Sequence, residues 1–195
     1  MQRAWQTCIM LGALLAFPPL AAATPSPNSD APPRQSARVE THGNMRARTA
    51  LEKRVHRELV RLPYFSVFDN LEFRVDDYRV TLTGQVTRPS LRRDAEKLVK
   101  RLEGVEAVVN NVEVLPVSFN DDRIRRATYR ALFNLNSPLH RYGVAPVPSI
   151  HIIVKRGHVT LIGVVASEGD SNIAYLRARS VPGSFSVTNR LRVAN

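Results

Sequence analysis

Cysteine is almost absent from this sequence of 195 residues, since Cys8 is its single example. A lone cysteine cannot form an intramolecular disulfide, and structural zinc sites that need two or more cysteines are excluded. The apolar run at residues 9–17 (IMLGALLAF) is too short to cross a bilayer. These features, with 44% hydrophobic and 23% charged residues, exclude multi-span membrane, collagen-like and coiled-coil proteins and indicate a globular chain.

Catalytic motifs and metal-ligand spacings are also lacking. The sequence has no G-x-S-x-G, no phosphate-binding glycine loop and no H-E-x-x-H motif. Its five histidines are scattered, and His151 and His158 flank a predicted hairpin at no metal-ligand spacing. The pair Asp121-Asp122 precedes a predicted helix, where carboxylates cap N–H groups and complement the helix dipole. We therefore expect no enzymatic activity, no cofactor and no bound metal.

Residues 1–23 have the pattern of a secretory signal peptide. Arg3 precedes the apolar run, a proline pair ends it, and small residues allow cleavage after Ala23. The alternative is an uncleaved amphipathic N-terminus. Because Cys8 lies before the apolar run, whereas the modified cysteine of a lipoprotein follows it, no lipid anchor is expected. The pattern predicts an exported protein.

Residues 24–48 are predicted to form a disordered linker. They contain four prolines and almost no large apolar residues. Such a segment cannot bury enough apolar surface to offset the entropy lost on ordering. We expect it to serve only as a tether.

The body of the chain is an internal repeat. The stretch Val80–Val86 (VTLTGQV) recurs as Val159–Val165 (VTLIGVV), and the same separation without a gap relates Gly104 to Gly183. Matches in so regular a register indicate two copies of one folded unit.

The two copies are predicted to span residues 49–116 and 117–195. The second has about six extra residues in the proline-containing loop 137–149, and insertions of this kind are tolerated in surface loops. The helices and strands are assigned in the first copy, and the second copy is expected to have the same order.

Hydrophobic periodicity divides each copy into five elements. Leu51, Val55 and Leu59 lie at helical spacing, and Pro89 suits the first position of a second helix. In the first copy we expect a helix over 51–62, strands over 72–75 and 79–86, a helix over 89–102 and a strand over 108–115. The predicted fold class is α+β, with two tandem α-β-β-α-β units, each a three-stranded sheet with two helices on one face.

Two sequence patterns in the repeat resemble the BON domain, named for bacterial osmotically inducible and nodulation proteins. One is the strand V-T-L-x-G-x-V, and the other is G-V-x-x-V-x-N-x-V-x-V, found here at residues 104–114. The resemblance covers both copies, although Gly183 is followed by Ser184-Phe185 and Gly169 interrupts the second helix of the second copy. It implies a non-enzymatic periplasmic protein of the bacterial envelope, whose domains bind phospholipid surfaces or other envelope components.

Positive charge is concentrated in the second copy. This copy has eleven basic and four acidic residues, against twelve and eleven in the first. Clustered basic residues on an exported protein favour anionic phospholipid headgroups, at about 1 kcal/mol per residue near such a surface. Nucleic acid is another partner of basic modules, but export argues against it. A solvated basic surface without a partner is the alternative.

The first helix of the second copy is predicted to carry the lipid contact on its outward face. At about 100° per residue its buried stripe consists of Ile124, Thr128, Ala131, Leu132 and Leu135. Arginines attract headgroup phosphates, and aromatic rings lie at headgroup level. The expected lipid-binding residues are Arg123, Arg125, Arg126, Tyr129, Arg130 and Phe133. The alternative is that Tyr129 and Phe133 pack against the other domain.

The second sheet has an apolar face on the side away from its helices. Ile153, Ile162 and Val164 lie on it, where the first copy has polar side chains. Because an exposed apolar face usually marks a contact, these residues are predicted at an interface with the first domain or a second subunit.

Two hypotheses about function follow. In the first, the second domain binds anionic phospholipid peripherally and the first domain is a structural or protein-binding partner. In the second, the protein is an adaptor for envelope assembly or stress that uses the apolar sheet face without touching lipid. Salt distinguishes them, because ionic strength weakens electrostatic binding much more than a dry apolar interface.

Overall fold

The computed structural model describes residues 34–145 and 148–194, with side chains from Met45 onward. The first repeat contains α1 (Arg34–Leu59), β1 (Asn70–Asp76), β2 (Arg79–Val86), α2 (Pro89–Lys100), β3 (Ala107–Asn110) and β4 (Glu113–Val114). The second contains α3 (Phe119–Phe133), α4 (His140–Gly143), β5 (Ile150–Lys155), β6 (His158–Val165), α5 (Glu168–Arg179) and β7 (Ser186–Val193). The short helix α4 lies in the loop predicted to hold the extra residues.

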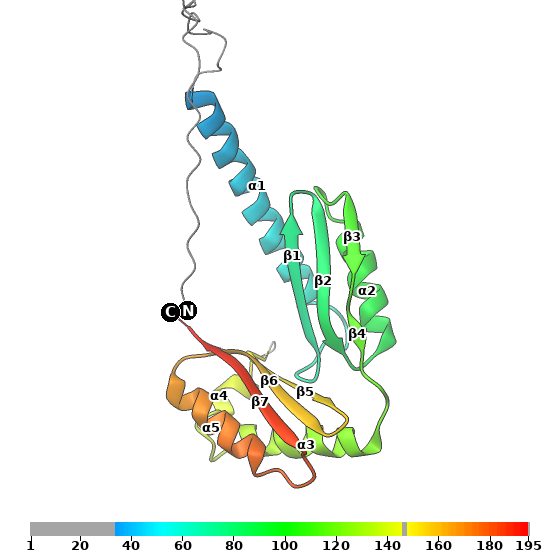
Figure 1. Cartoon of the computed structure of the whole chain (residues 1–195), viewed down its shortest axis with the longest axis vertical. Helices are drawn as coiled ribbons and strands as arrows, with labels where there is room; N and C mark the ends of the chain where they lie inside the picture. Colours follow the sequence, from blue (N-terminus) through cyan, green and yellow to red (C-terminus); the bar gives the residue numbers. More distant parts are fainter. Residues whose placement is uncertain (1–33, 146–147, 195) are drawn as a thin grey trace, which may run out of the picture.

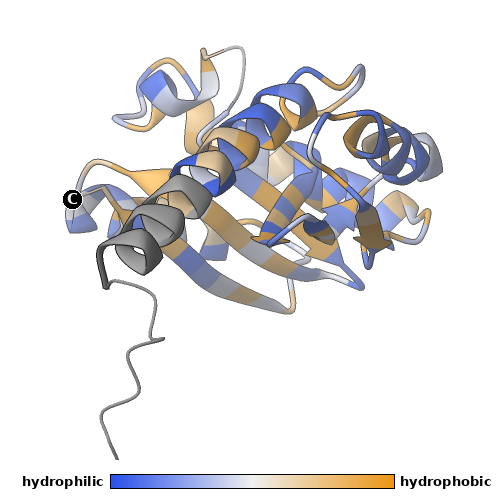
Figure 2. Ribbon diagram, turned by 90° about the horizontal axis from the view of Figure 1, so that it is seen from above, coloured by the Kyte–Doolittle hydropathy of each residue, from blue (hydrophilic) through white to orange (hydrophobic). Residues whose placement is uncertain are grey.

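The two sheets have the same topology (Figure 1). Their central strands, β2 and β6, pair antiparallel with the preceding strand and parallel with the last one. Two helices cover one face of each sheet, and the strands show the alternation of hydrophilic and hydrophobic residues that a half-buried sheet requires (Figure 2). The predicted fold class of two tandem α-β-β-α-β units is confirmed.

An asparagine repeated in both copies ties the last strand to the second helix. Asn110 donates from Nδ2 to the carbonyl oxygen of Arg92 on α2, at 2.9 Å, and its Oδ1 accepts the N–H of Val112. Asn189 makes the same pattern of bonds with α5 and with Leu191. In the first copy the predicted strand 108–115 is divided here into β3 and β4, whereas β7 is continuous.

The glycine of the repeated strand motif allows two backbones to approach closely. Gly84 and Gly163 have φ angles of 114° and 136°, in a region that side chains disfavour. A Cβ atom on Gly84 would lie 2.2 Å from the carbonyl oxygen of Asn70, and one on Gly163 would lie 2.0 Å from that of Ser149. Both glycines are therefore required by the backbone of the neighbouring strand.

Helix α1 begins within the predicted linker. Residues 34–48 are helical, so the prediction that all of 24–48 is disordered is wrong for this part. The four prolines all precede Arg34, and the residues after it include good helix formers such as alanine, glutamate and arginine. The predicted signal peptide and the first part of the linker lie outside the described residues.

The first repeat packs on the face of the second sheet that α3 and α5 leave uncovered (Figure 1). The loop between α1 and β1 also contacts the free edge of this sheet, where the carbonyl oxygen of Val67 accepts the N–H of Ile152 on β5 at 2.7 Å. The Val67 side chain belongs to the core of the second repeat. An ion pair between Lys155 and Glu113 also joins the repeats.

Candidate functional site on helix α3 and the domain boundary

Helix α3 is fixed at its first turn. The Ser118 hydroxyl caps the helix by accepting the N–H of Asp121. The buried carboxylate of Asp121 accepts the N–H groups of Arg156 and Gly157 in the β5–β6 turn, both at 2.8 Å. These bonds set the rotation of α3 about its axis and so decide which of its side chains reach solvent.

Three of the predicted lipid-binding arginines are exposed on α3: Arg123, Arg126 and Arg130. In the part of the chain that the structure describes, no carboxylate oxygen lies within the 4.0 Å ion-pair distance of their guanidinium groups. Residues three and four apart on a helix share a face, so the three form one stripe. Their charges are available to an anionic partner.

Arg125, by contrast, is a structural residue. It is only 5% exposed, its Nη2 donates to the carbonyl oxygen of Val154 at 2.7 Å, and its Nη1 pairs with Asp122. Its Nε is buried without a hydrogen-bond partner among the described residues. The prediction that Arg125 binds lipid is wrong, because its side chain turns inward to hold α3 against β5.

The two aromatic rings in the C-terminal half of α3, Tyr129 and Phe133, pack against each other, and Tyr129 remains 37% exposed. Phe133 is 6% exposed and belongs to the second core, so its predicted lipid contact is also wrong. Tyr129 lies edge-on between Phe133, at 5.1 Å, and Phe68 of the first repeat, at 6.2 Å between ring centroids. The alternative in which these rings pack on the other domain fits Tyr129, whereas Phe133 is buried in the core of its own repeat. Leu135, predicted in the buried stripe, is exposed because α3 ends at Phe133.

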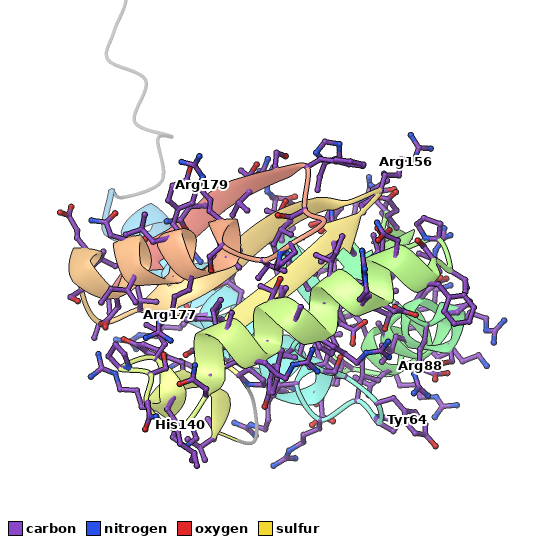
Figure 3. All side chains as sticks on the ribbon, turned by 90° about the horizontal axis from the view of Figure 1, so that it is seen from below. Tyr64, Arg88, His140, Arg156, Arg177 and Arg179 are labelled. Carbon is purple, nitrogen blue, oxygen red and sulfur yellow. The ribbon has the colours of Figure 1, made fainter. Side chains whose placement is uncertain are left out.

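A cleft of about 380 Å³ opens where the first repeat meets α3. Its lining comes from both repeats: Phe68, Thr87, Arg88, Leu115, Pro116, Val117, Asp122, Arg125 and Arg126. Arg88 was not singled out by the sequence, and its guanidinium carbon lies 4.6 Å from the centre of the Tyr64 ring. Figure 3 shows Tyr64 and Arg88 near the N-terminal end of α3.

Two apolar residues beside this cleft are nearly fully exposed. Val117, which lines it, is 96% exposed, and Phe119, the first residue of α3, is 94% exposed. Sequence reasoning missed both, although a valine and a phenylalanine in the short connection between two repeats are a detectable signal. Large apolar groups at this exposure, next to arginines that have no acidic partner among the described residues, are typical of a contact surface.

The predicted interface residues of the second sheet lie at the boundary with the first repeat to different degrees. Ile153 is 5% exposed, Ile162 is half-buried and Val164 is 39% exposed. Ile162 and Val164 line a cavity of about 360 Å³, together with Phe65 of the loop between α1 and β1 and residues of α1 and β1. The ring of His151 packs beside Phe65 there, and burial lowers the pKa of this histidine.

No helix in the described residues is long and apolar enough to cross a membrane. Within the same residues, no three histidine, cysteine, aspartate or glutamate side chains gather as a metal site would require.

Both repeats match the family model of the BON domain, over residues 47–116 and 121–195. No curated protein matches the chain. Among solved structures it is similar to CdsD, described as a structural protein of the type III secretion system of Chlamydia trachomatis, with 12% identity, a TM-score of 0.28, and 75% of this chain and 94% of that one covered. For the C-terminal domain of CdsD the identity is 14%, the TM-score 0.25 and the coverage 72% and 96%. Scores of this size carry no argument about function.

Proposed function

This chain belongs to the BON domain family, and from that membership and the arginines of α3 we propose that it binds anionic phospholipid surfaces of the bacterial envelope. The protein has no enzymatic role and binds the membrane peripherally. It is exported by means of the signal peptide at residues 1–23, and its second domain contacts the membrane from the periplasmic side. The observation that carries the proposal is the exposed stripe on α3 formed by Arg123, Arg126 and Arg130, which has no acidic partner among the described residues.

The stripe extends to the first residue of α3. Phe119 precedes Arg123 by four residues, and Arg126 and Arg130 continue the same face at helical spacing. The arginines supply attraction to headgroup phosphates, at about 1 kcal/mol each near an anionic surface. Phe119, with Val117 just before the helix, supplies apolar area that an interface can bury. These two residues provide the apolar contact with lipid that was expected from Tyr129 and Phe133.

Co-sedimentation with liposomes tests the proposal. The purified protein is mixed with vesicles of phosphatidylcholine alone or with phosphatidylglycerol, at low and moderate salt. We expect binding to the anionic vesicles only, weaker at higher salt because the Debye length shortens. The double variant Arg126→Glu/Arg130→Glu should lose this binding.

A matched control reverses two arginines elsewhere. Arg190 and Arg192 lie on β7 and alternate with Leu191, which packs on the core, so they face the side of the second sheet opposite α3. Arg190→Glu/Arg192→Glu changes the net charge equally and should retain most of the binding. Absence of binding to anionic vesicles at low salt would refute the proposal.

A second candidate function rests on the cavity beside the second sheet. Ile162 and partly exposed Val164 line it, and an adaptor protein would use such an apolar surface for a protein partner. Binding through it would be little affected by salt and unaffected by Arg126→Glu/Arg130→Glu.

A further inference from the structure

The cleft at the domain boundary holds positive charge that the described residues leave unneutralised. Three arginines and one aspartate line it, and the aspartate, Asp122, is already paired with Arg125. Arg88 comes from the first repeat and Arg126 from the second. Neither guanidinium has a carboxylate within 4.0 Å in the described part of the chain. Two free arginines from two domains therefore face one small space.

The position of Arg88 is fixed on both sides. The preceding residue, Thr87, donates its N–H and its hydroxyl to Asp69, at 2.6 and 2.8 Å, and Asp69 is completely buried. The following residue, Pro89, has a restricted backbone. The guanidinium itself lies over the Tyr64 ring, at a distance suited to a cation–π contact. An arginine held in this way loses less conformational entropy when it binds a ligand.

The backbone of the Tyr64 loop supports the same arrangement. Tyr64 has a φ of 68°, an uncommon conformation for a residue with a side chain. Asp69, which fixes Thr87, also accepts the N–H and hydroxyl of Ser66 from this loop, at 3.0 and 2.6 Å. One buried carboxylate thus joins the loop that carries Tyr64 to the residue before Arg88.

We propose that this cleft binds a phosphate ester, with the phosphate held between Arg88 and Arg126. The planar guanidinium matches the oxygen geometry of phosphate and keeps its charge at all accessible pH values. Helix α2 starts at Pro89 with no acidic residue in its first turn and no side-chain cap, so its positive end adds to the attraction. A volume of about 380 Å³ accommodates a phosphate together with a small polar alcohol.

Exposed apolar groups near the cleft distinguish between two sources of such an ester, a phospholipid headgroup and a soluble phosphate ester. Val117 lines the cleft and Phe119 follows two residues later, and both are nearly fully exposed, so a glycerophospholipid with its headgroup in the cleft would meet apolar surface beside it. A soluble phosphate ester shares the phosphate chemistry but gains little from the apolar rim. In the lipid case this inference rests on the proposed function and adds to it a ligand pocket that requires the first domain.

Titration with soluble probes tests the inference. Inorganic phosphate, glycerol 3-phosphate and monomeric dihexanoylphosphatidylglycerol are titrated into the protein by isothermal calorimetry and by amide NMR shifts. We expect the short-chain lipid to bind most tightly. Arg88→Gln and Arg126→Gln should each weaken its binding about tenfold, the loss of roughly one charge-assisted contact. Arg190→Gln, at an exposed arginine on β7 outside the cleft lining, should change it less than twofold.

Further measurements distinguish a failure of this inference from a failure of the proposed function. Arg88 is exposed, so Arg88→Gln should unfold at the same temperature as the parent protein, and Arg88→Lys should recover part of the affinity as a charge without the planar fork. If Arg88→Gln is fully folded and binds every probe normally, the inference is overturned, even if anionic vesicles still bind through α3. If glycerol 3-phosphate binds in an Arg88-dependent manner but vesicles do not bind, the cleft is a site for soluble phosphate esters and the proposed function fails.

Discussion

Arg125 on α3 donates a hydrogen bond from Nη2 to the backbone carbonyl oxygen of Val154 on β5, at 2.7 Å. This bond, with the pairing of Arg125 and Asp122, attaches the helix that carries the exposed arginine stripe to the sheet beneath it. The orientation of the exposed arginine stripe therefore depends on Arg125, an arginine that is itself buried.

Replacing Arg125 should destabilise the protein. In Arg125→Leu the carbonyl oxygen of Val154 loses its side-chain partner, and a buried acceptor left unpaired costs about 1–3 kcal/mol of unfolding free energy. Urea unfolding measures this loss. Arg130→Leu, which removes an exposed arginine from the same helix, should change stability by about 0.5 kcal/mol or less. Equal effects of the two substitutions would contradict the structural role of Arg125.

Two glycine substitutions should separate backbone strain from steric clash. Gly104→Ala keeps a φ of 87° but meets no atom within 4 Å, so it should cost about 1 kcal/mol through strain alone. Gly84→Ala adds a clash with the carbonyl oxygen of Asn70 and should cost clearly more, since backbone must shift. Thermal unfolding compares them, and similar losses would show that the approach of β1 to Gly84 is not restrictive.

Gly169→Ala should instead stabilise the second repeat. Gly169 was expected to interrupt the second helix of this copy, but α5 starts at Glu168 with Ser167 as its cap and runs through Gly169. A methyl group there would be 3.6 Å from the Ser167 hydroxyl, an ordinary contact. Alanine in a helix is favoured over glycine by about 0.5–1 kcal/mol, so the melting temperature should rise. An unchanged or lower melting temperature would argue against this geometry.

Acidification should weaken the packing of the two repeats through His151. Burial lowers the pKa of His151 in the folded protein, so below the ordinary histidine pKa the unfolded chain binds more protons than the folded one. Stability linked to this group is present above that pH and falls as the pH drops below it. Urea unfolding at pH 7.5 and 5.5 should show the loss. His151→Phe should reduce the difference, and a variant that kept the full difference would contradict this role of His151.

The fold could be predicted well from the sequence, because the residues repeated in both copies are required by contacts within each copy. Gly84 and Gly163 meet the backbone of the adjacent strand, and Asn110 and Asn189 bridge strand and helix, so these requirements recur in any copy of the unit. The candidate site was predicted only in part. A helical projection gives a direction within one domain and omits what the neighbouring domain covers.

Part of the site was missed because of that limit, whereas Arg125 and Phe133 are buried within their own domain. Tyr129 points outward from its own domain and meets Phe68 of the other repeat. Arg88 and Arg126 line one cleft although they are 38 positions apart in the sequence, and their proximity depends on how the two domains pack. The sequence patterns do not indicate how the two domains pack.

Phe119→Ser tests whether apolar contact contributes to the proposed binding. Phe119 is 94% exposed, so its removal should leave the unfolding temperature unchanged. Partial burial of a phenylalanine side chain at a lipid interface contributes about 1 kcal/mol, and affinity for phosphatidylglycerol vesicles should therefore fall about fivefold. Leu135→Ser is the matched control, because Leu135 is 84% exposed just beyond the other end of α3. Equal losses from Phe119→Ser and Leu135→Ser would show that general surface hydrophobicity, rather than the N-terminal end of α3, determines binding. No loss from either would leave an interaction carried by the arginines alone.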